Sequence, residues 1–339
     1  MKKGTLLIIF VAVIFSLTMA FIPSPALAEA KYKVTFGHVE PVHTSIHVAA
    51  EKIKELIEMR TKGEFEVSVH PASELGPGPD QGQMTQSGAI QMAILPGAHI
   101  AGIFPEVQVF AIPFMFPGSL EEAAKIMNGP AAEKLFSYMG KIDLVGLAVY
   151  PHAHKQFTSN KPIKVPADFE GQKIRTMAAP IIVESYKLLG ASPTPINYHE
   201  VYSALQLGTV DGEENPFWSI GAMKFYEVQK YIVESNHALI VTVFIVNKNW
   251  FESLPENYQK IIREVAQEVV PFQIESEAKI DNEWKEKIMQ HKGTTLTKLT
   301  PEAREAFKQK LAPVKEVYVK LVGASGKESL EAFEKAMAK

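Results

Sequence analysis

The amino-acid sequence predicts an α/β protein built from two lobes. Strand and helix patterns alternate along the chain, and residues 32–69 open it with a strand, a helix and a second strand, the order of a parallel βαβ unit. A length of 339 residues suits about two domains, and a hydrophobic content of 46% is enough to give each a core. Because ligands of open α/β sheets bind at the carboxyl ends of the strands, polar side chains at those ends are the candidate ligand contacts.

The N-terminus has the pattern of an export signal. Two lysines precede an apolar run over residues 6–22, and the small residues Ala26 and Ala28 follow two prolines. This predicts a signal peptide over residues 1–28 and a periplasmic mature chain. The alternative is an uncleaved membrane anchor, since the run is long, but the prolines favour cleavage. No later segment is long and apolar enough for us to expect membrane insertion of the mature chain.

Composition excludes several classes of protein. There is no cysteine, so neither a disulfide framework nor a lipid anchor on a cysteine is available, and a net charge of -3 does not favour nucleic-acid binding. His43 and His47 have a spacing that can hold a metal ion, but no carboxylate follows His43 as in zinc proteases. We therefore expect no metal and no cofactor.

In the first lobe, which we predict from residues 29–152 and 240–280, two strand ends nominate ligand contacts. His38 and Glu40 follow the first strand, and Leu95 ends a buried strand over residues 89–95. Packing in the core is the equal alternative for His38 and Glu40. A helix that begins at Ser119 and a strand over residues 143–150 complete this part of the chain.

The second lobe, predicted from residues 153–239 and 281–339, supplies two basic candidates. Arg175 lies on a short alternating strand, and its guanidinium is a planar fork of donors that fits a carboxylate. Lys155 lies on the preceding strand. The alternative for both is an ordinary solvated surface charge.

A helix over residues 180–189, a strand over residues 193–196 and a helix from Tyr198 follow. Asn197 with Glu200 resembles a capping box at the start of that last helix. Tyr198 itself either packs in the core or lines the ligand site.

Residues 211–218 hold further candidates. Asn215 precedes a proline, which pushes its backbone toward extended dihedrals and aims its amide. It could instead be the N-cap of a helix whose first residue is Pro216. Glu213 and Glu214 are adjacent carboxylates that we expect to be solvated. Trp218 could border a ligand.

The chain then returns to the first lobe through a β-branched strand over residues 238–246. Ser253 and Glu256 form a capping-box pattern before a long amphipathic helix, which Pro271 should kink. Helices over residues 301–320 and 328–339 end the chain.

Five segments occur in the order and at the spacing of one family: Asn160–Ile163, Pro166–Arg175, Gly190–Pro195, Glu200–Pro216 and Tyr226–Tyr231. Together they resemble the DctP-type solute-binding protein of a tripartite ATP-independent periplasmic (TRAP) transporter. The resemblance implies a two-lobed periplasmic-binding-protein-like fold, with a central cleft and a long kinked helix spanning both lobes. It also implies TRAP membrane subunits as partners.

By the same resemblance, Arg175 grips a substrate carboxylate and Asn215 supports it, while Tyr198 stands where the family often has an aromatic wall. A second arginine is common where this chain has Lys155, so that anchor should be single-pronged or water-mediated.

The sequence thus predicts a monomeric, extracytoplasmic protein that captures a small organic acid. A zwitterionic or aromatic carboxylate is an alternative ligand, with Glu40 meeting a cationic end. An exported enzyme is an alternative of another class, although no nucleophile elbow or zinc-protease motif is present.

Overall fold

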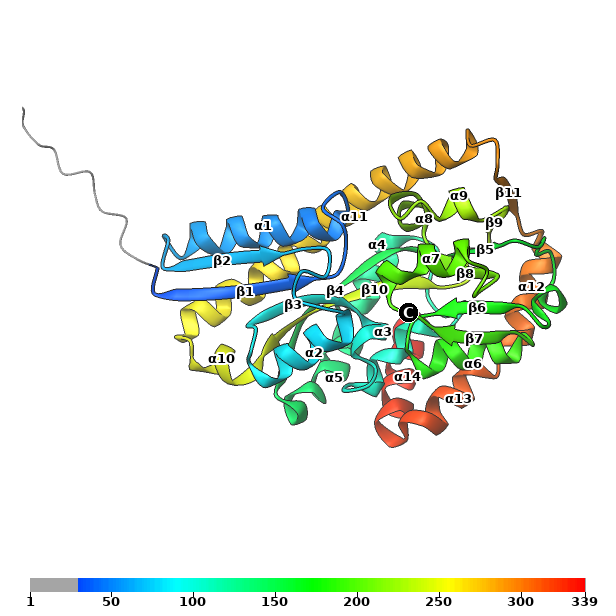
Figure 1. The fold of residues 1–339 in the computed structure, drawn as a ribbon. Helices are drawn as coiled ribbons and strands as arrows, with labels where there is room; N and C mark the ends of the chain where they lie inside the picture. Colours follow the sequence, from blue (N-terminus) through cyan, green and yellow to red (C-terminus); the bar gives the residue numbers. More distant parts are fainter. Residues whose placement is uncertain (1–29, 339) are drawn as a thin grey trace, which may run out of the picture.

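The structure is a computed structural model that describes residues 30–338, so the predicted signal peptide lies outside the described residues. Two mixed sheets form two lobes (Figure 1). The sheet of lobe one has the strand order β2-β1-β3-β10-β4, and the sheet of lobe two has the order β11-β9-β5-β8-β6-β7. The two-lobed α/β fold predicted from the sequence is confirmed.

Lobe one begins with the predicted βαβ unit, because β1 pairs in parallel with both β2 and β3. β10 then runs antiparallel between β3 and β4. The strands are β1 (Tyr32–His38), β2 (Phe65–His70), β3 (Met92–Pro96), β4 (Leu144–His154) and β10 (Leu239–Asn247). The helices are α1 (Ser45–Arg60), α2 (Gly78–Ser87), α3 (Gly97–Ile100), α4 (Leu120–Met127), α5 (Pro130–Phe136) and α10 (Lys248–Ser253), with 3-10 turns η1 (Pro105–Ala111) and η2 (Met139–Ile142).

In lobe two, β8 is an inner strand, paired antiparallel with β5 on one side and in parallel with β6 on the other. The strands are β5 (Gln156–Ser159), β6 (Lys173–Thr176), β7 (Ser192–Pro195), β8 (Gly212–Asn215), β9 (Tyr231–Glu234) and β11 (Thr295–Lys298). The helices are α6 (Pro180–Leu188), α7 (Val201–Gln206), α8 (Phe217–Ala222) and α9 (Phe225–Val228), with 3-10 turns η3 (Pro166–Phe169) and η4 (Tyr198–Glu200). The expected capping box at Asn197 is wrong, because Asn197 makes no side-chain cap bond.

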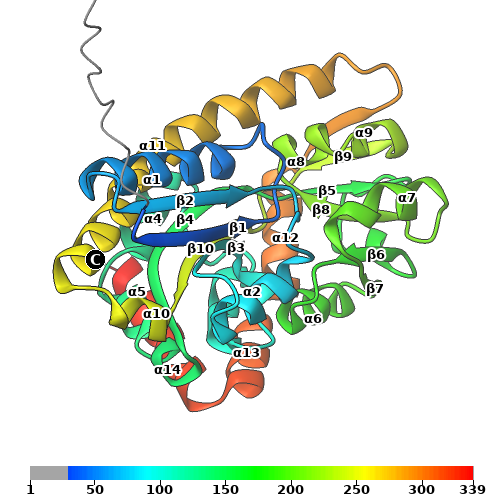
Figure 2. The ribbon, with the colours of Figure 1, turned by 60° about the vertical axis from the view of Figure 1, so that its left-hand side comes forward.

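Helix α11 (Glu256–Met289) joins the lobes. It packs against α1 and β4 in lobe one and against α8 in lobe two, and Figure 2 shows it running over α1 and on toward α8 and α9. Pro271 lies inside the helix. The expected cap at Ser253 is wrong: the N-cap is Pro255, and Ser253 ends α10, where its hydroxyl bonds the carbonyl of Trp250.

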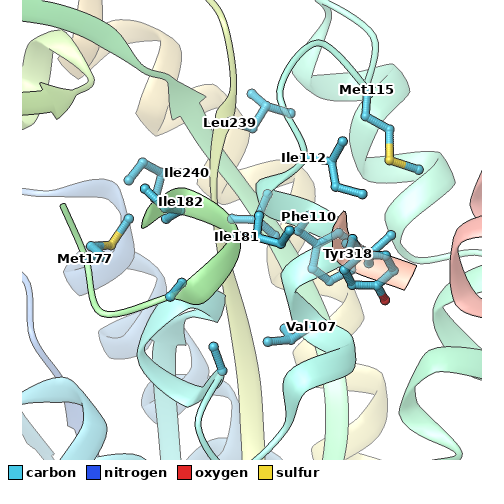
Figure 3. Packing of buried hydrophobic residues seen from close by; sticks show 14 of the residues in the cluster. Val107, Phe110, Ile112, Met115, Met177, Ile181, Ile182, Leu239, Ile240 and Tyr318 are labelled. Carbon is cyan, nitrogen blue, oxygen red and sulfur yellow. The ribbon is translucent and has the colours of Figure 1, made fainter. Parts of the chain in front are cut away.

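The C-terminal helices contact both lobes, since α14 packs against α5 in lobe one while α13 packs against α6 in lobe two. They are α12 (Pro301–Leu311), α13 (Val314–Val322) and α14 (Ala324–Met337). Beside α13, apolar side chains of both lobes meet in one cluster, with Phe110 of lobe one near Ile181 of lobe two and Tyr318 of α13 (Figure 3). This packing holds the lobes together at one side of the molecule and leaves a cleft elsewhere between them.

Candidate functional site

A cavity with two connected parts lies between the lobes. The outer part, which we call the vestibule, has a volume of about 470 Å³, and the inner part, the inner chamber, is a narrow space of about 20 Å³. Residues of both lobes line the inner chamber: Val39, Glu40, Pro96, His99, Arg175, Met177, Tyr198, Asn215, Trp218 and Ile240. Five of the eight predicted site residues, Arg175, Asn215, Tyr198, Glu40 and Trp218, therefore come together around one space.

Arg175 is the cation of this chamber. It lies on β6 and is only 2% exposed, so the alternative of a solvated surface arginine is wrong. Its Nε and Nη2 both donate to the carbonyl oxygen of Ile196, at 2.9 and 2.8 Å. These bonds fix the plane of the guanidinium. Burial lowers the pKa of Arg175 and nearby Glu213 raises it, and an arginine remains charged under such influences.

Asn215 stands beside this guanidinium at the end of β8. The interpretation as a helix N-cap is wrong, because helix α8 starts at Phe217 and its N-cap is Pro216. The preference of a pre-proline residue for extended dihedrals decides the outcome, and Asn215 remains in the strand. Its Nδ2 donates to the carboxylate of Glu213, which fixes the orientation of the amide.

Glu213 and Glu214 are buried, 1% and 4% exposed, so the expectation that they are solvated is wrong. The reason is that β8 is an inner strand covered on both faces. Glu214 accepts hydrogen bonds from Lys155, from the hydroxyl of Tyr186 and from Nε2 of His237. Burial alone would raise the pKa of Glu214, but Lys155 and His237 outweigh it and lower the pKa to about 2.

Glu213 has a weaker set of partners. Besides Asn215, its Oε1 accepts a hydrogen bond of 3.1 Å from the hydroxyl of Thr158. Burial raises the pKa of Glu213 to about 7, against the opposing influence of Asn215 and Arg175. Arg175 and Asn215 line the chamber, whereas Glu213 and Glu214 support them without lining it, and we call these four residues the anion wall.

Lys155 is placed differently from the sequence expectation. The alternative of an exposed lysine is wrong, because the side chain is 2% exposed and Nζ lies 2.6 Å from Oε1 of Glu214. Lys155 lines neither the inner chamber nor the vestibule. A ligand could reach its ammonium group only if this ion pair opened, so contact between Lys155 and a ligand stays a prediction.

A second group of residues that line the chamber, which we call the facing wall, consists of Glu40, His99 and Trp218. Glu40 follows β1 and is 3% exposed, and its Oε2 has no hydrogen-bond partner within the described chain. Burial raises the pKa of Glu40 to about 8. Nε1 of Trp218 is likewise buried without a partner. Tyr198, in contrast, has a hydrogen-bond partner, since its hydroxyl bonds Oγ of Ser219 at 2.8 Å.

His38 and Leu95 lie behind the chamber and line neither part of the cavity. Nε2 of His38 is 3.1 Å from Nδ1 of His47, and Leu95 is fully buried. Within residues 30–338 no three side chains of metal-binding type gather in one place. Across the same residues, no helix combines the length and apolar character that crossing a membrane requires.

His99 is a chamber residue that sequence reasoning missed. It lies on α3, directly after the strand end that nominated Leu95, and it lines both parts of the cavity. Its Nδ1 is buried without a partner, and a side chain on Gly78 would collide with the ring. Burial, and then the charge of Arg175, lower the pKa of His99 to about 4. The imidazole therefore faces the guanidinium as a neutral group.

Comparison with known proteins gives one consistent match. The model of the family "Bacterial extracellular solute-binding protein, family 7", DctP, matches residues 36–321. The ectoine-binding periplasmic protein TeaA of Halomonas elongata is 31% identical over 305 residues, covering 88% of each chain. The C4-dicarboxylate-binding periplasmic protein DctP of Rhodobacter capsulatus is 33% identical over 302 residues, covering 88% of this chain and 90% of that one.

Among solved structures, a TRAP periplasmic solute-binding protein from Desulfovibrio salexigens with bound orotic acid superposes with a TM-score of 0.88. It is 36% identical, and the match covers 91% of this chain and 99% of that chain. The similarity thus includes both lobes and the cavity between them.

Proposed function

The chain belongs to family 7 of the bacterial extracellular solute-binding proteins, the DctP family, and on this premise we propose that it captures a small organic carboxylate and delivers it to the membrane subunits of a TRAP transporter. Members of this family bind solutes and are not enzymes. The observation that carries the proposal is the buried guanidinium of Arg175, held in plane at the junction of the inner chamber and the vestibule.

The energetics of this site suit a carboxylate. Each charge-assisted hydrogen bond is worth about 1.5 to 3 kcal/mol, and micromolar affinity needs about 8 kcal/mol in all. Two bonds from Arg175 would supply about 3 to 6 kcal/mol of that free energy. Burial against Met177 and Tyr198 and closure of the lobes would supply the rest.

A second candidate ligand class follows from the facing wall. Glu40 offers a buried oxygen without a partner and Trp218 a buried N–H without one. A carboxylate that also carries a cationic or N–H-bearing group would satisfy Glu40, and a neighbouring acceptor would satisfy Trp218. A dicarboxylate would bring its second negative charge to Glu40 and would require that Glu40 keep its proton. Relatives are named for ectoine and for C4-dicarboxylates, and one structure contains orotic acid.

The location and the partners belong to the same proposal. The relatives named above are periplasmic proteins, and we propose that residues 1–28 are a cleaved signal peptide that sends this chain to the same place. We further propose that the mature chain works as a monomer and meets the TRAP membrane subunits after it has closed on its ligand.

Native mass spectrometry of the purified protein tests the ligand class. We expect a co-purified small molecule that contains a carboxylate. Thermal unfolding with succinate, orotate and ectoine as probes complements this test, and at least one of them should raise the melting temperature. A co-purified molecule without an acidic group, together with no thermal shift from any of the three probes, would refute the proposal.

A further inference from the structure

Behind the facing wall lies a buried cluster of three protonable side chains that carboxylate binding does not explain. Its members are Glu40 before α1, His152 on β4 and Glu277 on α11, which are 3%, 0% and 1% exposed. Nε2 of His152 lies 3.0 Å from Oε2 of Glu277 and 3.5 Å from Oε2 of Glu40. Neither contact has the geometry of a hydrogen bond, so both ring nitrogens of His152 are buried without a hydrogen-bond partner in the described chain. The imidazole therefore stands between two carboxyl groups, one of which lines the inner chamber.

The cluster is held from several elements. Oγ of Ser45, at the start of α1, donates to Oε2 of Glu277 at 2.5 Å, and Gln273, one turn earlier on α11, donates to the same Oγ at 3.0 Å. The ring of His152 meets the ring of Trp218 edge to face, with centroids 4.5 Å apart. On α11, Asp281 accepts the backbone N–H of Trp218 at 2.8 Å. The cluster thus touches lobe one, α11 and the helix that carries Trp218.

No fixed cation neutralises these carboxyl groups within the described chain. Asp281 and Glu40 are the charged neighbours of Glu277, and Tyr198 is near Glu40. The nearest permanent positive charges are Arg175 across the chamber, where it faces Glu213, and Lys285 beside Asp281. On β1 and α1, His38 and His47 bond each other.

Two buried carboxyl groups that are this close together do not both ionise. The protons of Glu40, His152 and Glu277 therefore titrate as those of a coupled cluster and are not assigned to one residue. Burial raises the pKa of Glu277, with Asp281 adding to the effect, and burial lowers the pKa of His152 to about 3. Near neutral pH the cluster therefore holds protons on its carboxyl groups beside a neutral imidazole.

We propose that His152 is a positioning residue of the ligand chamber: with Glu277 it shares a proton with Glu40, and so decides whether Glu40 offers a ligand an ionised oxygen or a hydroxyl donor. This inference rests on the proposed function only in taking the inner chamber as the ligand site. A ligand with a cationic group would draw the proton away from Glu40 into solvent. A ligand with an acceptor at that position would keep the proton in place.

The test needs no ligand, so its failure is separate from a failure of the carboxylate proposal. The chain has three tryptophans, and a Trp250→Phe, Trp284→Phe protein leaves Trp218 as the only one, next to His152. Its fluorescence is followed against pH in this background and in the added variants Glu40→Gln, Glu277→Gln, His152→Leu and His152→Gln. His154→Gln, a change on the same strand outside the cluster, is the matched control.

We expect a fluorescence step with a midpoint near pH 8, because burial raises the pKa of Glu40 to about 8. This step should be absent in Glu40→Gln. Glu277→Gln keeps a neutral group at this position but removes the carboxyl that shares the proton, so the midpoint should move by about one pH unit. His152→Leu removes the polar ring beside Glu40 Oε2 and should raise the midpoint, whereas His152→Gln restores a polar side chain and should return the midpoint toward the starting value.

A step that persists in Glu40→Gln, or midpoints within about 0.2 pH unit of the background in both Glu277→Gln and His152→Leu, would overturn the inference. Should His152→Leu fail to fold, the isosteric Glu277→Gln variant decides. Its infrared spectrum must then show that the carbonyl stretch of protonated Glu40 disappears at a different pH from that in the background protein. If the carbonyl stretch disappears at the same pH in the variant and in the background protein, the inference is also overturned.

Discussion

The two walls of the inner chamber differ in how completely their polar groups are satisfied. On the anion wall, Glu214 has three hydrogen-bonding partners, and two nitrogens of Arg175 are fixed by one carbonyl oxygen. On the facing wall, Glu40, His99 and Trp218 each keep a buried polar atom without a partner. On the anion wall the carboxylates are therefore paired and the guanidinium is fixed before a ligand arrives, whereas the facing wall keeps unpaired polar atoms.

This difference separates two tasks of recognition. A pre-organised fork binds a carboxylate with little further ordering, so the anion wall serves any organic acid that fits. An unsatisfied buried group costs about 1 to 3 kcal/mol, which a ligand with the complementary group recovers and other ligands do not. The facing wall therefore sets specificity, and variation there would allow one fold to serve different acids.

The largest effect that would sharpen this comparison concerns the stability of the anion wall. Glu214→Ala leaves Lys155 buried without its counter-charge, and we expect the free energy of unfolding to fall by about 3 to 5 kcal/mol. Urea unfolding followed by circular dichroism measures it.

Glu184 provides the matched control, because it pairs with Lys187 at the same 2.6 Å but on the surface. Glu184→Ala should cost about 1 kcal/mol or less. Equal losses in the two variants would show that the buried network does not hold the anion wall together.

The sequence predicted the fold and the positions of Arg175 and Asn215 at the cavity, because these depend on local signals, but it did not predict the burial of Glu213 and Glu214. Hydrophobic periodicity marks the βαβ unit, and the proline after Asn215 keeps that residue extended. The partner of Lys155 could not be predicted in the same way. Glu214 lies 59 positions away and meets Lys155 only because β5 and β8 pair in one antiparallel register.

The facing wall was predicted less well, for a related reason. The rule that ligands bind at strand ends nominated Glu40, which lines the cavity, but it also nominated His38 and Leu95, which do not, and it missed His99. Nothing local marks His152, which becomes important only because α11 places Glu277 beside it. Buried polar groups that are joined by tertiary packing leave no periodic pattern in the sequence.

A smaller effect concerns the contribution of the facing wall to the pH dependence of the protein's stability. Burial raises the pKa of Glu40 to about 8, so the folded protein keeps a proton that the unfolded chain releases above about pH 4.5. Stability should therefore fall as pH rises through this window. Glu40→Gln removes this pH dependence. Between pH 4.5 and pH 8 the free energy of unfolding of the variant, relative to that of wild type, should rise by about 1 to 3 kcal/mol.

Urea unfolding at a series of pH values measures this gain. Glu66→Gln, a change of an exposed carboxylate on β2, serves as the control and should follow wild type. A pH profile of Glu40→Gln that runs parallel to that of wild type would mean that Glu40 is not held as a buried acid, and the contrast between the walls would then be lost.

The central claim, that Arg175 holds a ligand carboxylate between the two walls, is tested most directly by calorimetric titration of the carboxylate that the purified protein binds. Arg175→Ala removes two charge-assisted bonds, and the dissociation constant should rise at least about 100-fold. Arg175→Lys, which keeps the charge without the fork, should fall between that variant and wild type. Arg304→Ala, at a guanidinium that bonds the carbonyls of Ser235 and Asn236 outside the cavity, should bind like wild type. An Arg175→Ala protein that binds within about threefold of wild type would contradict the account.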